Sequence, residues 1–116
     1  MPLHIRELLV DAQGCAGPLD DPDALEAGLR DAAAAVGADV RGHCVVRFVP
    51  HGVTAVLVLA ESHILVSTWP EHRLALVDIL LCNEAMDPAR AWVALAQLLQ
   101  PGEVVERAIE RIVPQP

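Results

Sequence analysis

The segment from Val53 to Ala60 is almost entirely apolar, and it is the part of this chain that most constrains its fold. It follows a turn signal at residues 50–52, ends before Glu61, and is far shorter than the roughly 18 apolar residues of a membrane span. Side chains alternate between the two faces of a strand, so this strand is apolar on both of its faces. We therefore expect a central strand in a sheet that needs cover on both sides.

The strand expected over Asp39–Val49 has a different pattern. Its apolar residues alternate with charged ones, which is typical of a strand that is exposed on one face. Cys44 belongs to the apolar set and is expected to be a small buried side chain. Three more segments have strand signals, at Leu3–Val10, His63–Trp69 and Leu74–Leu81.

Two helices begin with the same signal, an aspartate that can cap the helix followed by a proline. The first begins at Asp21-Pro22 and ends near Gly37. The second begins at Asp87-Pro88 and stops at Pro101-Gly102. The tail 103–113 fits a helix by the spacing of its apolar residues, but that spacing alone does not decide its structure.

This order of elements predicts an α+β fold, a two-layer sandwich with a mainly antiparallel sheet and two helices on one face. The 116 residues make one domain, residues 1–116. The start of the chain lacks the pattern of a signal peptide, so we expect a cytoplasmic protein without a membrane segment.

Composition argues against several classes of function. The net charge of -8 and the absence of a basic cluster disfavour binding to nucleic acid. The three cysteines, Cys15, Cys44 and Cys82, are far apart and lie in no pattern of zinc ligands. We therefore expect neither a disulfide nor a metal site.

A set of residues at fixed spacing carries the functional signal. It comprises Phe48-x-Pro50-x-Gly52-Val53, Glu61-Ser62-His63, Thr68-Trp69-Pro70-Glu71, Asp78 and Cys82. This pattern resembles the small bacterial and archaeal S-adenosylmethionine decarboxylases. The resemblance is loose before Asp20 and after Gly102, and it implies a strand for the tail.

The resemblance implies that the cofactor is made from the chain itself. The hydroxyl of Ser62 would attack the carbonyl of Glu61, and elimination from the resulting ester would release residues 1–61 from residues 62–116. A pyruvoyl group would then replace Ser62, form a Schiff base with the amine of a substrate and accept electrons during decarboxylation. No metal takes part.

Three more residues acquire roles from the resemblance, and Trp69 is a further candidate beside them. Cys82 corresponds to the thiol that returns a proton to the decarboxylated carbon, and a thiol is mostly protonated near neutral pH. Phe48 corresponds to the ring that stacks on adenine, and Glu71 to the carboxylate that binds the ribose hydroxyls. Trp69 lies beside them in sequence and could attract the sulfonium charge.

Two positions depart from the family pattern. Ser67 stands where the family has a histidine that assists cleavage, and a hydroxyl is a much weaker base than an imidazole. Thr54 stands where the family has a serine that also assists. The nearby histidines His51, His63 and His72 are candidates for a replacement base, although the position of each in the sequence fits a surface or turn histidine better.

Three functions follow as alternatives. The first is decarboxylation of S-adenosylmethionine to supply aminopropyl groups for spermidine synthesis. The second is the same pyruvoyl chemistry on another amine-bearing substrate such as arginine or ornithine, and the third is an unprocessed paralogue without catalysis. The resemblance also implies a homodimer in which two sheets stack into four layers, with the helices outside.

Overall fold

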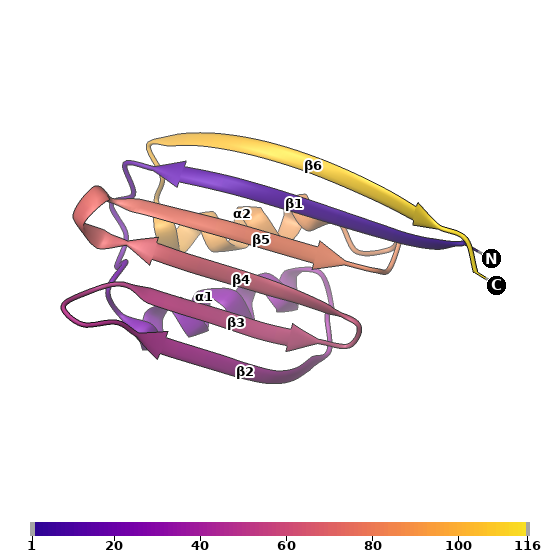
Figure 1. The fold of residues 1–116 in the computed structure, drawn as a ribbon, viewed down its shortest axis with the longest axis horizontal. Helices are drawn as coiled ribbons and strands as arrows, with labels where there is room; N and C mark the ends of the chain where they lie inside the picture. The colour runs from indigo at the N-terminus through magenta and orange to yellow at the C-terminus, as the bar shows by residue number, and fades with distance from the viewer. Residues whose placement is uncertain (1, 116) are drawn as a thin grey trace.

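The computed structural model describes residues 2–115 and shows one six-stranded antiparallel sheet with two helices on one face (Figure 1). The strand order is β2-β3-β4-β5-β1-β6. In chain order the elements are β1 (Leu3–Gln13), α1 (Pro22–Ala35), β2 (Val40–Arg47), β3 (Val53–Leu59), β4 (Ser62–Trp69), the 3-10 helix η1 (Pro70–His72), β5 (Leu74–Leu81), α2 (Pro88–Leu99) and β6 (Glu103–Val113). The α+β fold expected from the sequence is confirmed.

Both helices begin where the sequence predicts. The Asp21 carboxylate accepts a hydrogen bond from the backbone N–H of Ala24 at 3.1 Å, and Asp87 accepts one from Ala89 at 3.0 Å. Each proline follows its cap within the first turn of the helix. Within residues 2–115, neither helix is long and apolar enough to cross a membrane.

The core lies between the helices and one face of the sheet. Strand β3 buries every second residue there, beginning at Val53 and ending at Leu59, and α1 covers them with Leu25 and Leu29. No helix covers the other face in the described part of the chain (Figure 1). Val58 of β3 points to this uncovered face and keeps 47% of its surface exposed.

Two expectations about β2 and β3 are wrong. Strand β3 is second from an edge, because β2 beside it is the edge strand. The two central strands are β4 and β5. Cys44 is exposed. An irregularity between Val40 and Gly42 shifts the pairing of β2, so Val45 packs against the core while Cys44 lies opposite Val56 on the uncovered face.

The tail forms strand β6, as the family resemblance implies. It pairs with β1 along its whole length, from Leu3 opposite Val113 to Gln13 opposite Glu103. This pairing satisfies the backbone groups of a segment whose side chains are almost all exposed. Long-range pairing with β1 therefore overrides the helical spacing of its apolar residues.

Thr68 of β4 is the buried polar residue of the core, with 5% of its surface exposed. Its hydroxyl accepts a hydrogen bond from the backbone N–H of Val53 at 3.0 Å and donates one to the carbonyl of Leu19 at 2.7 Å. The side chain thus fastens the start of β3 and the loop before α1 to the middle of the sheet.

Replacing Thr68 with valine should therefore destabilise the fold. The change keeps the shape of the side chain but leaves the buried N–H of Val53 without this partner, which costs roughly 1–3 kcal/mol. Urea unfolding of the Thr68→Val chain should show a lower midpoint, while Thr68→Ser, which keeps the hydroxyl, should lie closer to the native chain. An unchanged midpoint in Thr68→Val would contradict this role.

Candidate active site

The residues that the sequence singles out fall into two groups at opposite ends of the sheet (Figure 1). The first group, which we call the turn group, consists of Glu61, Ser62 and Cys82. The second, which we call the η1 group, consists of Phe48, Thr54, Ser67, Trp69 and Glu71. The two ends of β4 carry one group each.

The Glu61–Ser62 bond lies in the tight connection between β3 and β4. Leu59 and Ser62 are paired across the two strands, so only Ala60 and Glu61 form the turn. Glu61 has a φ of 64°, in the left-handed region that costs a residue with a side chain roughly 1–2 kcal/mol. The Ser62 hydroxyl donates to the carbonyl of Ala60 at 3.3 Å. The Glu61–Ser62 peptide bond that an acyl shift requires therefore lies in a strained turn, in which the Ser62 hydroxyl is engaged with the carbonyl of Ala60.

Cys82 lies next to this turn, just beyond the end of β5. Its Sγ donates a hydrogen bond to Glu61 Oε2 at 3.7 Å. Burial raises the pKa of the Cys82 thiol, and the negative charge and hydrogen bond of Glu61 raise it further. Cys82 is therefore held as a protonated thiol, which suits a proton donor. A cavity of about 500 Å³ adjoins all three residues of the turn group.

The η1 group lines a second cavity, of about 370 Å³. Thr54 and Ser67 are direct neighbours on β3 and β4, and their hydroxyl oxygens are 3.0 Å apart. The rings of Phe48 and Trp69 are 49% and 38% exposed, so both have apolar surface free for a ligand. Glu71 completes this cavity from η1.

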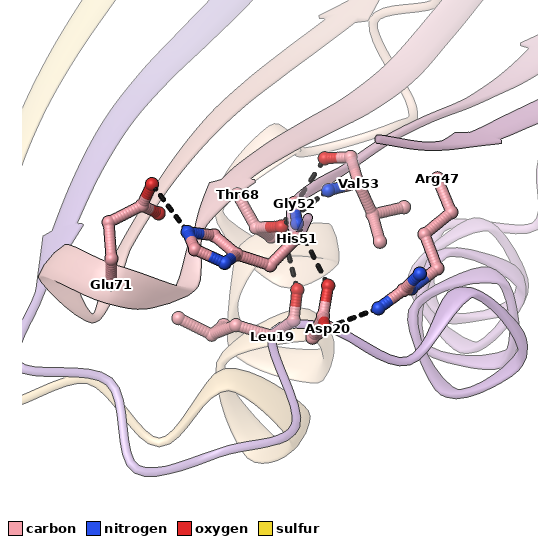
Figure 2. A network of polar contacts seen from close by, with 8 residues as sticks. All are labelled: Leu19, Asp20, Arg47, His51, Gly52, Val53, Thr68 and Glu71. Atoms are coloured by element: carbon pink, nitrogen blue, oxygen red, sulfur yellow. Dashed lines mark hydrogen bonds and ion pairs between the residues drawn. The ribbon is translucent and has the colours of Figure 1, made fainter. Parts of the chain in front are cut away.

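His51 belongs to the same cavity, which the sequence alone did not establish. Its Nε2 is 2.8 Å from Glu71 Oε2 (Figure 2). The backbone N–H of Glu71 itself is the largest cause that lowers the pKa of the Glu71 carboxyl, and the hydrogen bond from His51 and the nearby imidazoles lower it further. Glu71 therefore stays ionised.

The turn that carries His51 is anchored to the loop before α1 (Figure 2). Asp20 accepts a hydrogen bond from the Gly52 N–H at 2.8 Å and forms an ion pair with Arg47 at 2.8 Å. These two contacts lower the pKa of the Asp20 carboxyl. Gly52 has a φ of 107°, and an added Cβ would lie 3.2 Å from the carbonyl oxygen of Thr68, so only glycine fits comfortably.

A single chain does not bring the two groups together. Ser62 and Trp69 stand at the two ends of β4, and seven residues of extended chain span roughly 23 Å. This distance is well beyond the reach of side chains. The sequence motif gives the expected site residues but not the distances between them.

The structure also gathers Glu7, His63 and Asp78 on the uncovered face, which the sequence did not predict. Their ligand-type atoms lie within 4.8 Å of one another, and His63 Nε2 is 3.4 Å from Asp78 Oδ2. A hydrogen bond to Asp78 raises the pKa of Glu7, with burial and the charge of Asp78 adding to the effect. The negative charge of Asp78 thus favours the protonated form of Glu7.

Comparison with known proteins supplies the family. A family described as S-adenosylmethionine decarboxylase matches residues 6–112. This chain belongs to that family. Family membership confirms the resemblance found in the sequence motif, and it covers nearly the whole sheet and both helices.

Individual relatives in the S-adenosylmethionine decarboxylase family agree over most of the chain. The S-adenosylmethionine decarboxylase proenzyme of Moorella thermoacetica is 36% identical over 96% of this chain and 90% of its own length. The proenzyme of Thermosipho melanesiensis is 38% identical over 71% of this chain and 63% of its own length, just under two thirds. The crystal structure of the adenosylmethionine decarboxylase from Aquifex aeolicus has a TM-score of 0.88 at 29% identity, with coverage of 98% and 94%.

The protonated state of Cys82 can be tested by alkylation of the Ser62→Ala chain, in which the turn keeps its peptide bond. Cys82 should react with iodoacetamide only above the pH typical of a free thiol, about 8.5. Glu61→Gln should lower the pH at which Cys82 begins to react. The pKa of Cys82 should still stay above that of a free thiol, because burial is the larger cause of its rise.

The measurement is peptide-resolved mass spectrometry across pH, with added N-acetylcysteine as the reference thiol for the reagent. Rapid alkylation of Cys82 at pH 7 would mean that it is a thiolate and would contradict its assignment as a proton donor.

Proposed function

We propose that this chain is a self-cleaving, pyruvoyl-dependent decarboxylase of S-adenosylmethionine. The observation that carries the proposal is the turn group, in which Ser62 follows a left-handed Glu61 beside the protonated thiol of Cys82. Its product would serve as an aminopropyl donor for spermidine synthesis.

Cleavage would proceed in three steps, an acyl shift, an elimination and a hydrolysis. The Ser62 oxygen attacks the carbonyl carbon of Glu61, the C–N bond breaks, and the nitrogen takes the hydroxyl proton to give an ester. A base then removes the Cα proton of residue 62, its electron pair forms a Cα=Cβ bond, and the Glu61 carboxylate leaves. Addition of water and loss of ammonia finally convert the new terminus to the pyruvoyl group.

The surroundings of Ser62 fit such a group. Residue 62 is half-buried at a cavity of about 500 Å³, which leaves room for a substrate at its carbonyl. When formed, the pyruvoyl carbonyl would supply the electron sink for decarboxylation. Cys82 would hold a proton next to the reacting carbon, and the raised pKa of its thiol keeps that proton in place before the reaction.

The η1 group would bind the nucleoside part of the substrate. Phe48 and Trp69 offer exposed aromatic faces to adenine and to the sulfonium charge. Glu71 is ionised and accepts hydrogen bonds, so its second oxygen can receive the ribose hydroxyls while the first holds His51. The reacting residues would thus lie in the turn group and the nucleoside-binding residues in the η1 group, so neither group alone would form a complete site.

We propose that a homodimer completes the site. The uncovered face carries exposed apolar side chains on several strands, among them Val46, Val58, Leu76 and Ile109. Burying such a surface favours association. If two of these faces stack about a two-fold axis that runs across the strands, the turn group of one protomer meets the η1 group of its partner. Each dimer would then hold two complete sites.

Self-cleavage should be visible in the intact mass of the purified chain. Two fragments, residues 1–61 and 62–116, should have a summed mass equal to that of the precursor plus water minus ammonia. Ser62→Ala should remain one chain, because no hydroxyl is left to attack, whereas Cys82→Ala keeps that hydroxyl and should still cleave.

Cleavage at this bond in Ser62→Ala would contradict the pyruvoyl mechanism. Release of carbon dioxide from S-adenosylmethionine, with arginine and ornithine measured beside it, tests the substrate. Activity on arginine or ornithine, with none on S-adenosylmethionine, would assign the same chemistry to that other substrate.

The dimer predicts both a mass and a pattern of complementation. Sedimentation at micromolar concentration should give about twice the 12.4 kDa of one chain. Cys82→Ala and Glu71→Ala chains, each nearly inactive alone, should regain activity when coexpressed, because one site of a mixed dimer contains neither change. A fully active monomer, or mixed dimers with no recovery, would contradict a shared site.

A further inference from the structure

The cavity of the η1 group is also lined by a histidine, His51, to which the proposed function assigns no chemical role. His51 lines the same cavity as Thr54 and Ser67, and its side chain is hydrogen-bonded at only one ring nitrogen among the described contacts of residues 2–115. The elimination step of self-cleavage needs a base to remove a Cα proton. The inference below rests on that proposed cleavage.

The other polar side chains of this cavity are poor candidates for the base. The hydroxyls of Thr54 and Ser67 are engaged with each other at 3.0 Å, and hydroxyls are very weak bases near neutral pH. The lowered pKa of Glu71 makes its carboxylate a weaker base than an ordinary glutamate. Imidazole is the side chain whose titration ordinarily falls nearest neutrality, so it is the best suited to accept a proton there.

The contact with Glu71 also sets which nitrogen of His51 is free. An ionised carboxylate can only accept a hydrogen bond, so Nε2 must be the donor in the 2.8 Å contact. In the neutral ring, Nδ1 then keeps its lone pair and can accept a proton. Glu71 stabilises the imidazolium that results, because the positive ring remains paired with the carboxylate.

The backbone around His51 is held in place on both sides. The Phe48 N–H donates to the Gly52 carbonyl at 2.7 Å, which closes the turn, and the Gly52 N–H is tied to Asp20 at 2.8 Å. Figure 2 shows His51 on this anchored turn, with its ring directed toward Glu71. The ring is therefore positioned by two independent constraints, one on the backbone and one on the side chain.

We propose that His51 is the base that removes the Cα proton of residue 62 in the facing protomer of the dimer, with Glu71 as its positioning residue. The proton moves to Nδ1 of His51, the Cα=Cβ bond forms, and the bond from Cβ to the ester oxygen breaks as the Glu61 carboxylate leaves. His51 thereby supplies the imidazole that Ser67 does not.

The test compares cleavage rates of freshly synthesised full-length chains. His51→Ala should cleave on the order of 100-fold more slowly than the native chain, a typical contribution of general base catalysis. His72→Ala is the matched control, since this exposed histidine of η1 does not line the cavity, and it should cleave at the native rate. Circular dichroism establishes that each variant is folded.

Two further measurements separate a chemical role from a structural one. The His51→Ala chain should accumulate the ester at position 62, which hydroxylamine cleaves and an amide resists. Added imidazole, or Ser67→His in the same chain, should restore cleavage by returning a base to the cavity.

Native-rate cleavage in a folded His51→Ala chain would overturn this inference and leave the proposed self-cleavage intact. So would slow cleavage that yields no ester and that neither imidazole nor Ser67→His restores. Absence of cleavage in the native chain and in Ser67→His alike would overturn the proposed function together with the inference.

Discussion

A six-stranded sheet has two faces, and this chain has helices for only one of them. Strands β3, β4 and β5 bury their alternate residues under α1 and α2, while the intervening residues, such as Leu65 and Leu76, lie on the uncovered face. This imbalance organises the rest of the molecule. In the proposed homodimer the uncovered face would be the surface for a second copy, and the turn group and the η1 group would be joined only across that surface.

Much of the fold follows from local sequence signals. The Asp-Pro caps locate both helices because they act within a single turn of chain, and alternation locates the strands. Local patterns misplaced Cys44 and left the tail undecided, because distant segments decide both outcomes. The shift of β2 between Val40 and Gly42 exposes Cys44, and pairing with β1 makes the tail a strand. No local sequence pattern predicts the irregular pairing of β2 or the pairing of the tail with β1.

The same distinction applies to the site. The motif identifies Ser62 and Cys82, and the structure brings these two together beside Glu61. The motif could not reveal that Phe48 and Glu71 lie at the far end of the sheet, because the spacing of residues along a sequence does not give their positions in space. Contacts between strands, such as that of His63 with Asp78, depend on register and were likewise out of reach.

The strand order bears on what a cut at residue 61 would leave behind. Residues 1–61 contribute β1, β2 and β3, and β1 lies between β5 and β6, which belong to residues 62–116. Three ladders, β3–β4, β5–β1 and β1–β6, would therefore join the two pieces. The break falls at the turn that closes the β3–β4 ladder, so most of this ladder and the other two ladders lie away from it. After such a cut the two pieces would therefore remain held together by these three ladders, with β1 of the first piece between two strands of the second.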